Sequence, residues 1–79
     1  MNYRIIKFDI DNLIVGRAYT LIPNENIDIW GETIKENESF DAILLEKYVD
    51  ELVFVRYCET EDYKYQRFVL LPNMNVDIK

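Results

Sequence analysis

The sequence predicts an all-β fold, a small barrel of five to six short strands with at most one short helical turn. Runs of residues with high strand propensity recur along the chain, and turn-forming residues separate them at intervals of about 10 residues. Residues 40–48, whose composition would also suit a helix, are not followed by the glycine that commonly closes one. Because the chain has 79 residues and neither a linker nor an internal repeat, we expect a single domain over residues 1–79.

Three runs in the first half of the chain are predicted strands: residues 3–10, 17–22 and 27–30. Between the first two we expect a turn over residues 11–16, where Gly16 is free to adopt a positive φ. Gly31 ends the third run. The polar segment 32–39, whose exception is Ile34, is expected to be a mobile loop.

The second half of the chain predicts a hairpin and a terminal strand. Residues 40–48 have a composition that also suits a helix, but they run without a stop signal through the turn 49–51, which favours a strand in a long hairpin. Residues 52–57 and 63–71 are strands around an acidic tip, residues 58–62, and a last short strand follows Pro72. Alternation places six side chains in the core: Phe8, Leu21, Leu44, Phe54, Phe68 and Leu70.

Residues 68–78, Phe-Val-Leu-Leu-Pro-Asn-Met-Asn-Val-Asp-Ile, carry a resemblance to a known fold. They resemble the end of Src-homology-3-like (SH3-like) barrels, where a strand meets a proline, one turn of 3₁₀ helix follows, and a valine starts the last strand. The hairpin 40–57 and the long loop 22–39 also suit such a barrel, which is partly open. Peptide-binding members hold polyproline ligands on aromatic residues and a proline, and the resemblance suggests Trp30, Tyr57 and Pro72 for those positions. The paired tryptophans of those members are absent, because the chain has one tryptophan.

The residue types argue against an enzyme and against any cofactor or metal. The chain has no histidine, one cysteine (Cys58) and one serine (Ser39), so nucleophiles and general bases are scarce. Carboxylates are abundant, but a paired-carboxylate site needs a pocket that separates two pKa values, and a chain of 79 residues has little interior to spare. We therefore expect no catalytic, cofactor-binding or metal-binding residues.

The charge favours a protein partner. Asp and Glu number 15 against 9 Lys and Arg, a net charge of -6, and the basic residues are dispersed, which makes nucleic-acid binding the second hypothesis. A small acidic protein can occupy a basic channel of another protein, because its carboxylates replace phosphates. The size, the acidity and a composition rich in residues of AT-rich codons point to a phage or prophage protein of a low-GC bacterium that binds or inhibits a host or defence protein. A structural subunit of a phage or host assembly is a third hypothesis.

We expect a cytoplasmic protein without contact to a membrane, because no apolar run approaches the roughly 18 residues of a membrane span and the N-terminus lacks the features of a signal peptide. An exposed sheet edge would permit a homo-oligomer.

The candidate partner-binding surface combines the loop after Trp30 with the acidic hairpin tip. A tryptophan beside charged residues is typical of interface hot spots, although a Trp30 that plugs one end of the barrel would explain the same pattern. The predicted contact residues are Trp30, Glu32, Glu36, Glu38, Glu59, Glu61 and Asp62.

Overall fold

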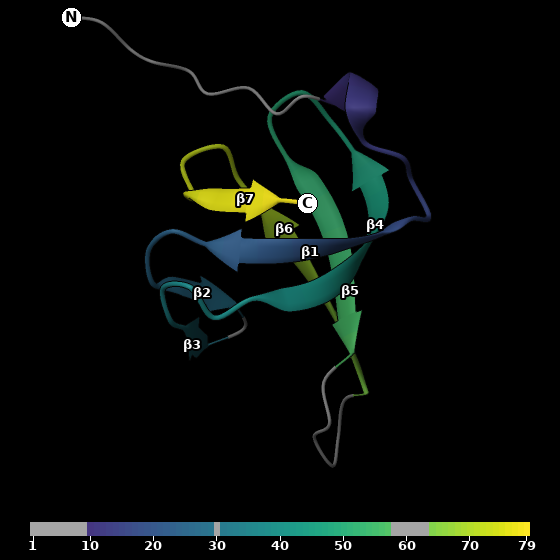
Figure 1. Cartoon of the computed structure of the whole chain (residues 1–79). Coiled ribbons are helices and arrows are strands. Elements are labelled where there is room, and N and C mark those ends of the chain that lie inside the picture. Colours follow the sequence, from purple (N-terminus) through teal and green to yellow (C-terminus); the bar gives the residue numbers. More distant parts are fainter. Residues whose placement is uncertain (1–9, 30, 58–63) are drawn as a thin grey trace, which may run out of the picture.

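The computed structural model describes residues 10–29, 31–57 and 64–79, and its secondary structure confirms the all-β prediction (Figure 1). The described residues contain one 3₁₀ turn, η1 (Ile10–Asn12), and seven strands: β1 (Ala18–Pro23), β2 (Ile27–Ile29), β3 (Glu32–Ile34), β4 (Phe40–Lys47), β5 (Leu52–Tyr57), β6 (Tyr65–Leu70) and β7 (Val76–Ile78). Seven strands exceed the predicted five to six. The strand predicted over residues 3–10 lies outside the described residues, except for Ile10, which begins η1.

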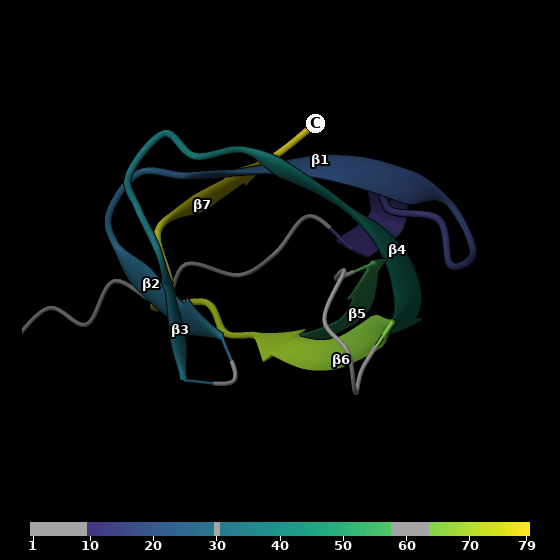
Figure 2. The same cartoon turned by 90° about the horizontal axis from the view of Figure 1, so that it is seen from below.

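Five of the strands form one antiparallel sheet in the order β6-β5-β4-β1-β7, and β2 pairs with β3 in a separate hairpin. Figure 2 shows the larger sheet bent so that β1 and β6 lie on opposite sides, with the β2–β3 hairpin standing at the side left open. A register shift between Leu44 and Glu46 marks a β-bulge in β4, where a strand bends most easily. The two sheets do not join into a closed barrel.

The ambiguous segment 40–48 is a strand, as favoured by the sequence. β4 pairs with β5 across a turn in which the Tyr48 amide donates to the Glu51 carbonyl at 2.9 Å. The turn predicted over residues 11–16 is present in part: η1 occupies its first two residues, 11 and 12, and Gly16 has the predicted positive φ, at 92°. After β6, the Met74 amide donates to the Leu71 carbonyl at 3.0 Å, so a hydrogen-bonded turn stands where the resemblance implies a 3₁₀ turn.

The prediction of a loop over residues 32–39 is wrong for its first three residues, which form β3. Gly31 has a φ of 77° and lets the chain reverse directly after β2. Ile34 then pairs with Ile27 and is buried, at 4% exposure. One apolar side chain in a polar segment is thus enough to hold a short strand when its partner strand presents an apolar face.

The core confirms five of the six side chains predicted to be buried. Leu21, Leu44, Phe54 and Leu70 are fully buried and Phe68 is 6% exposed, whereas Phe8 lies outside the described residues. The rings of Phe54 and Phe68 stack with centroids 5.8 Å apart. The hairpin adds three isoleucines that the sequence did not identify as core: Ile27, Ile29 and Ile34.

Candidate functional site

The strands β4, β5 and β6 are apolar on both sides of the sheet. Directly paired residues of neighbouring strands share a face, so Ile43, Val55 and Arg67 form one row across the sheet. A second row holds Glu46, Val53 and Val69, and a third holds Tyr57 and Tyr65. Because Leu44, Phe54 and Phe68 fill the core side, these rows lie on the opposite, convex side. We call the eight residues in these rows the outer face: Ile43, Glu46, Val53, Val55, Tyr57, Tyr65, Arg67 and Val69.

Four of the six apolar side chains of the outer face are in contact with solvent, whereas Val53 is buried, at 5% exposure, and Val55 is half-buried. Ile43 is 41% exposed, Val69 43%, Tyr57 58% and Tyr65 68%. Single exposed hydrophobic residues are common on protein surfaces, whereas neighbouring ones on one face mark a site of interaction. The outer face is of the second kind, because register places all four on adjacent strands of one sheet.

Tyr57 and Tyr65 form an exposed aromatic pair at one end of the outer face. They are cross-strand partners, and their rings meet edge to face with centroids 5.5 Å apart and planes at 70°. Each ring therefore supports the other in a fixed orientation while its remaining surface faces solvent. Such a pair combines apolar contact area with a hydroxyl that can donate or accept a hydrogen bond.

Charged groups lie among and beside these apolar residues. The Arg67 guanidinium donates to Glu46 at 2.8 Å across β5, and both side chains are exposed. At the margin, the Thr20 hydroxyl donates to Asp41 at 2.8 Å. Exposed ion pairs contribute little to stability, so the effect of Arg67 and Glu46 is to balance the charge of this face locally. An acidic chain thus presents a nearly neutral, apolar surface here.

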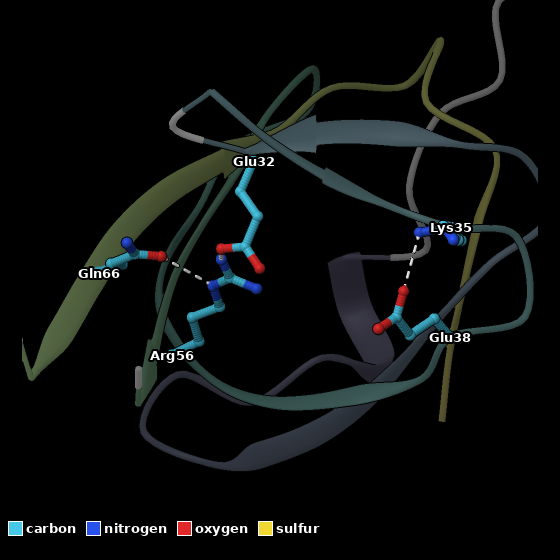
Figure 3. Close-up of polar contacts among 5 residues, drawn as sticks. All are labelled: Glu32, Lys35, Glu38, Arg56 and Gln66. Carbon is cyan, nitrogen blue, oxygen red and sulfur yellow. Dashed lines mark hydrogen bonds and ion pairs between the residues drawn. The ribbon is translucent and has the colours of Figure 1, made fainter. Parts of the chain in front are cut away.

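The structure places Glu32, one of the predicted contact residues, in an ion pair with the sheet. Its carboxylate lies 2.7 Å from the Arg56 guanidinium, which also donates to the Gln66 side chain at 3.0 Å (Figure 3). Arg56 is only 8% exposed, and its guanidinium carbon lies 5.5 Å from the centre of the Phe40 ring. Glu32 therefore neutralises a buried cation and ties the β2–β3 hairpin to β5.

Glu36 and Glu38 lie together in the turn that follows β3, away from Glu32 (Figure 3 shows Glu38 beside Lys35). The Lys35 amide donates to the Glu38 carboxylate at 3.1 Å, and the Glu36 amide donates to the Asn26 side chain at 2.9 Å. Both glutamates are exposed. The remaining predicted contact residues lie outside the described residues: Trp30, Glu59, Glu61 and Asp62.

Two features of the structure were not predicted from the sequence: the outer face, and the buried Arg56 on the opposite, core side of β5. The signal for the outer face was available, because residues 52–55 are apolar at every position rather than at alternate ones, which is typical of a strand covered or contacted on both sides. Arg56 gave no local signal. Its acidic partner Glu32 is 24 residues away in the sequence.

No protein family, curated protein or solved structure matches this chain. In the part of the chain that the structure describes, no three Asp, Glu or Cys side chains are grouped in a way that would hold a metal ion. The described helical structure includes no segment of the length and apolarity that crossing a bilayer requires. The outer face and the acidic turn are accordingly the two surfaces from which a function can be argued.

Proposed function

We propose that this chain is a non-enzymatic protein-interaction module that binds its partner through the outer face. The observation that carries the proposal is the exposure of Ile43, Tyr57, Tyr65 and Val69 on three adjacent strands. Tyrosine is enriched among interface residues that contribute most to binding energy, and a paired tyrosine loses little conformational freedom when a partner covers it. Charged groups accompany the apolar residues, as they do in most protein interfaces: the Arg67–Glu46 ion pair crosses β5 within the outer face, and Asp41 lies at its margin.

We also propose that the fold is a partly open SH3-like barrel. The order of elements supports this: β1 lies beside the last strand β7, β4–β5–β6 form a meander, and the loop from β1 to β4 contains the β2–β3 hairpin. The binding mode need not be the polyproline groove of the peptide-binding members. Tyr57, one of the residues suggested for that groove, packs against Tyr65 on the outer face.

A second contact region is the exposed acidic turn with Glu36 and Glu38, which would favour a basic partner. With a net charge of -6, the chain attracts basic surfaces before contact and so accelerates association. In this proposal the partner is a cytoplasmic host or defence protein and the chain is its phage-encoded inhibitor. Changing Glu36 and Glu38 to lysine is expected to slow association and to weaken its dependence on salt concentration, measured by surface plasmon resonance once a partner is captured.

The central test compares two aromatic sites in an affinity capture from the cell that makes the protein. Replacing Tyr57 and Tyr65 by alanine removes the aromatic pair, and we expect capture of the partner to fall by about 30-fold, the effect of losing a hot spot. Tyr48→Ala is the matched control, because Tyr48 is 47% exposed in the β4–β5 turn, away from the outer face.

Circular dichroism and thermal unfolding establish that all variants fold. If the Tyr57/Tyr65 variant captures its partner as well as the native protein does, or if Tyr48→Ala loses as much, the outer face is not the binding surface.

A further inference from the structure

We propose that the free edge of β6 binds an extended acidic segment of a partner protein, which adds to the sheet as another strand. The proposal rests on the proposed function, because Tyr65, Arg67 and Val69 belong both to β6 and to the outer face. It specifies how the partner is held: main-chain hydrogen bonds along β6 supply affinity, and side chains on the outer face supply specificity.

Among the described residues, β6 pairs with β5 and with no strand on its other side. Its six residues pair one by one with β5, from Leu52↔Leu70 to Tyr57↔Tyr65, without a register shift. The backbone N–H and C=O groups on the other side therefore form a regular row, which is a template for a further strand.

Within residues 10–29, 31–57 and 64–79, β6 shows few of the usual protections of an edge strand. Natural edges are shortened, bulged, interrupted by proline or lined with charge. The opposite edge of the sheet, β7, has three residues. In contrast, β6 has six residues, no proline, no bulge, and one charged side chain, Arg67, which is paired with Glu46.

The charge along this edge selects the partner. From Tyr63 to Val76 the sequence has no Asp or Glu, although the whole chain has 15, and the stretch includes Lys64 and Arg67. The edge is therefore apolar with two cations and no acidic residue of its own, and the exposed pairing of Arg67 with Glu46 is weak enough for an incoming carboxylate to share the guanidinium. An incoming strand with a carboxylate beside Arg67 and apolar side chains beside Tyr65 and Val69 would match it, because side chains of added strands alternate with the same period.

A second copy of this chain fits the edge less well. Two β6 strands paired around a central two-fold axis bring Arg67 close to the Arg67 of the other copy, and like charges across a strand pair are destabilising. The monomers also repel each other through their net charge of -6. The charge therefore favours an acidic segment from a different protein.

The test uses capped synthetic peptides of about seven residues, the length that spans β6. The first peptide has the sequence Thr-Val-Thr-Glu-Thr-Val-Thr. The second has lysine in place of the glutamate. The third has the sequence of the first with N-methyl groups on alternate amides. Peptides are titrated into the isotopically labelled full chain, and amide resonances are followed by NMR. We expect the glutamate peptide to shift alternate amides of β6 and to bind about tenfold more tightly than the lysine peptide.

Main-chain pairing requires that N-methylation of the amides facing β6 abolishes binding. Arg67→Glu should reverse the preference to the lysine peptide, whereas Arg17→Glu, an exposed arginine before β1, should leave it unchanged. Equal binding of the methylated and unmethylated peptides would overturn strand addition. Equal binding of the glutamate and lysine peptides would overturn the acidic assignment.

Two further measurements identify other occupants of the edge. A dimer in sedimentation that the glutamate peptide dissociates would assign the edge to a second copy and overturn the proposal. A chain lacking residues 1–9 that binds the peptide where the full chain does not would assign the edge to this protein's own N-terminal segment, with the same consequence. If the peptides fail while capture still depends on Tyr57 and Tyr65, strand addition is wrong and the proposed function stands.

Discussion

The β2–β3 hairpin and the β4–β5–β6 part of the sheet bury apolar residues in different ways. The hairpin is apolar on one face: Ile27, Ile29 and Ile34 point into the core, while Asp28 and Thr33 bond to each other on the outside at 2.8 Å. β5 is apolar on both faces: Leu52 and Phe54 point into the core, and on the outer face Val53 is buried, Val55 is half-buried and Tyr57 is exposed. One-sided alternation is explained by folding alone. The exposed apolar residues of the outer face, Ile43, Tyr57, Tyr65 and Val69, are not explained by folding, and that is where we locate the interaction.

The largest effect is expected from the core side of β5. Phe54→Ala removes a fully buried ring that stacks on Phe68, and the lost transfer energy and the remaining cavity should lower the free energy of unfolding by about 3–5 kcal/mol. Val69→Ala, on the outer face of the neighbouring strand, should change it by about 0.5 kcal/mol or less. Urea denaturation of both variants measures the contrast. Similar losses for the two would show that the outer face is packed in solution.

An intermediate effect is expected where the hairpin meets the sheet. Arg56→Ala removes a buried guanidinium and its contacts with Gln66 and Phe40, and should lower the free energy of unfolding by about 2 kcal/mol. Glu32→Ala should lower the free energy of unfolding by about 1–3 kcal/mol. The Glu32 carboxylate is itself exposed, but its removal leaves the buried Arg56 charge without its acidic partner.

A double-mutant cycle between Arg56 and Glu32 isolates their coupling, which we expect to be favourable. The matched pair is Glu46 and Arg67, both exposed, for which the same cycle should give about 0–1 kcal/mol. Coupling at Glu46–Arg67 as strong as at Glu32–Arg56 would contradict the assignment of Glu32 to tying the hairpin to the sheet.

The smallest effect is expected for the binding of nucleic acids to this chain. Exposed Tyr57 and Tyr65 near Lys64 and Arg67 are residue types that stack on bases and contact phosphates. However, two cations do not make the basic patch that a nucleic-acid backbone requires, and the chain repels polyanions overall through its net charge of -6. A gel shift with mixed RNA and DNA at low salt should show no complex. Micromolar binding that weakens steeply as salt rises would support the nucleic-acid hypothesis in place of ours.

The sequence was informative where the apolar pattern is continuous and local. The strands 18–23, 52–57 and 65–70 and the core residues Leu44 and Phe54 follow from alternation and turn residues alone. β3 could not be predicted in this way, because its contribution to the core is the single residue Ile34. The pairing of Glu32 with Arg56 could not be predicted either, because it depends on contacts between distant segments that no local pattern encodes. Both of these belong to the hairpin, whose position is determined by tertiary contacts.

The β-bulge in β4 has a consequence for how this chain tolerates change in length. Removing one residue from a strand ordinarily turns every following side chain to the other face. In β4 the pairs on either side of Leu45 are Leu44↔Phe54 and Glu46↔Val53, so Leu45 has no partner of its own. Deleting Leu45 would leave Ile43 and Glu46 on the outer face and every remaining pair intact. The deletion would instead remove the local twist, and with it some of the bend that brings β1 around the core. Residue 45 is thus a position where the curvature of the sheet can be altered separately from its register.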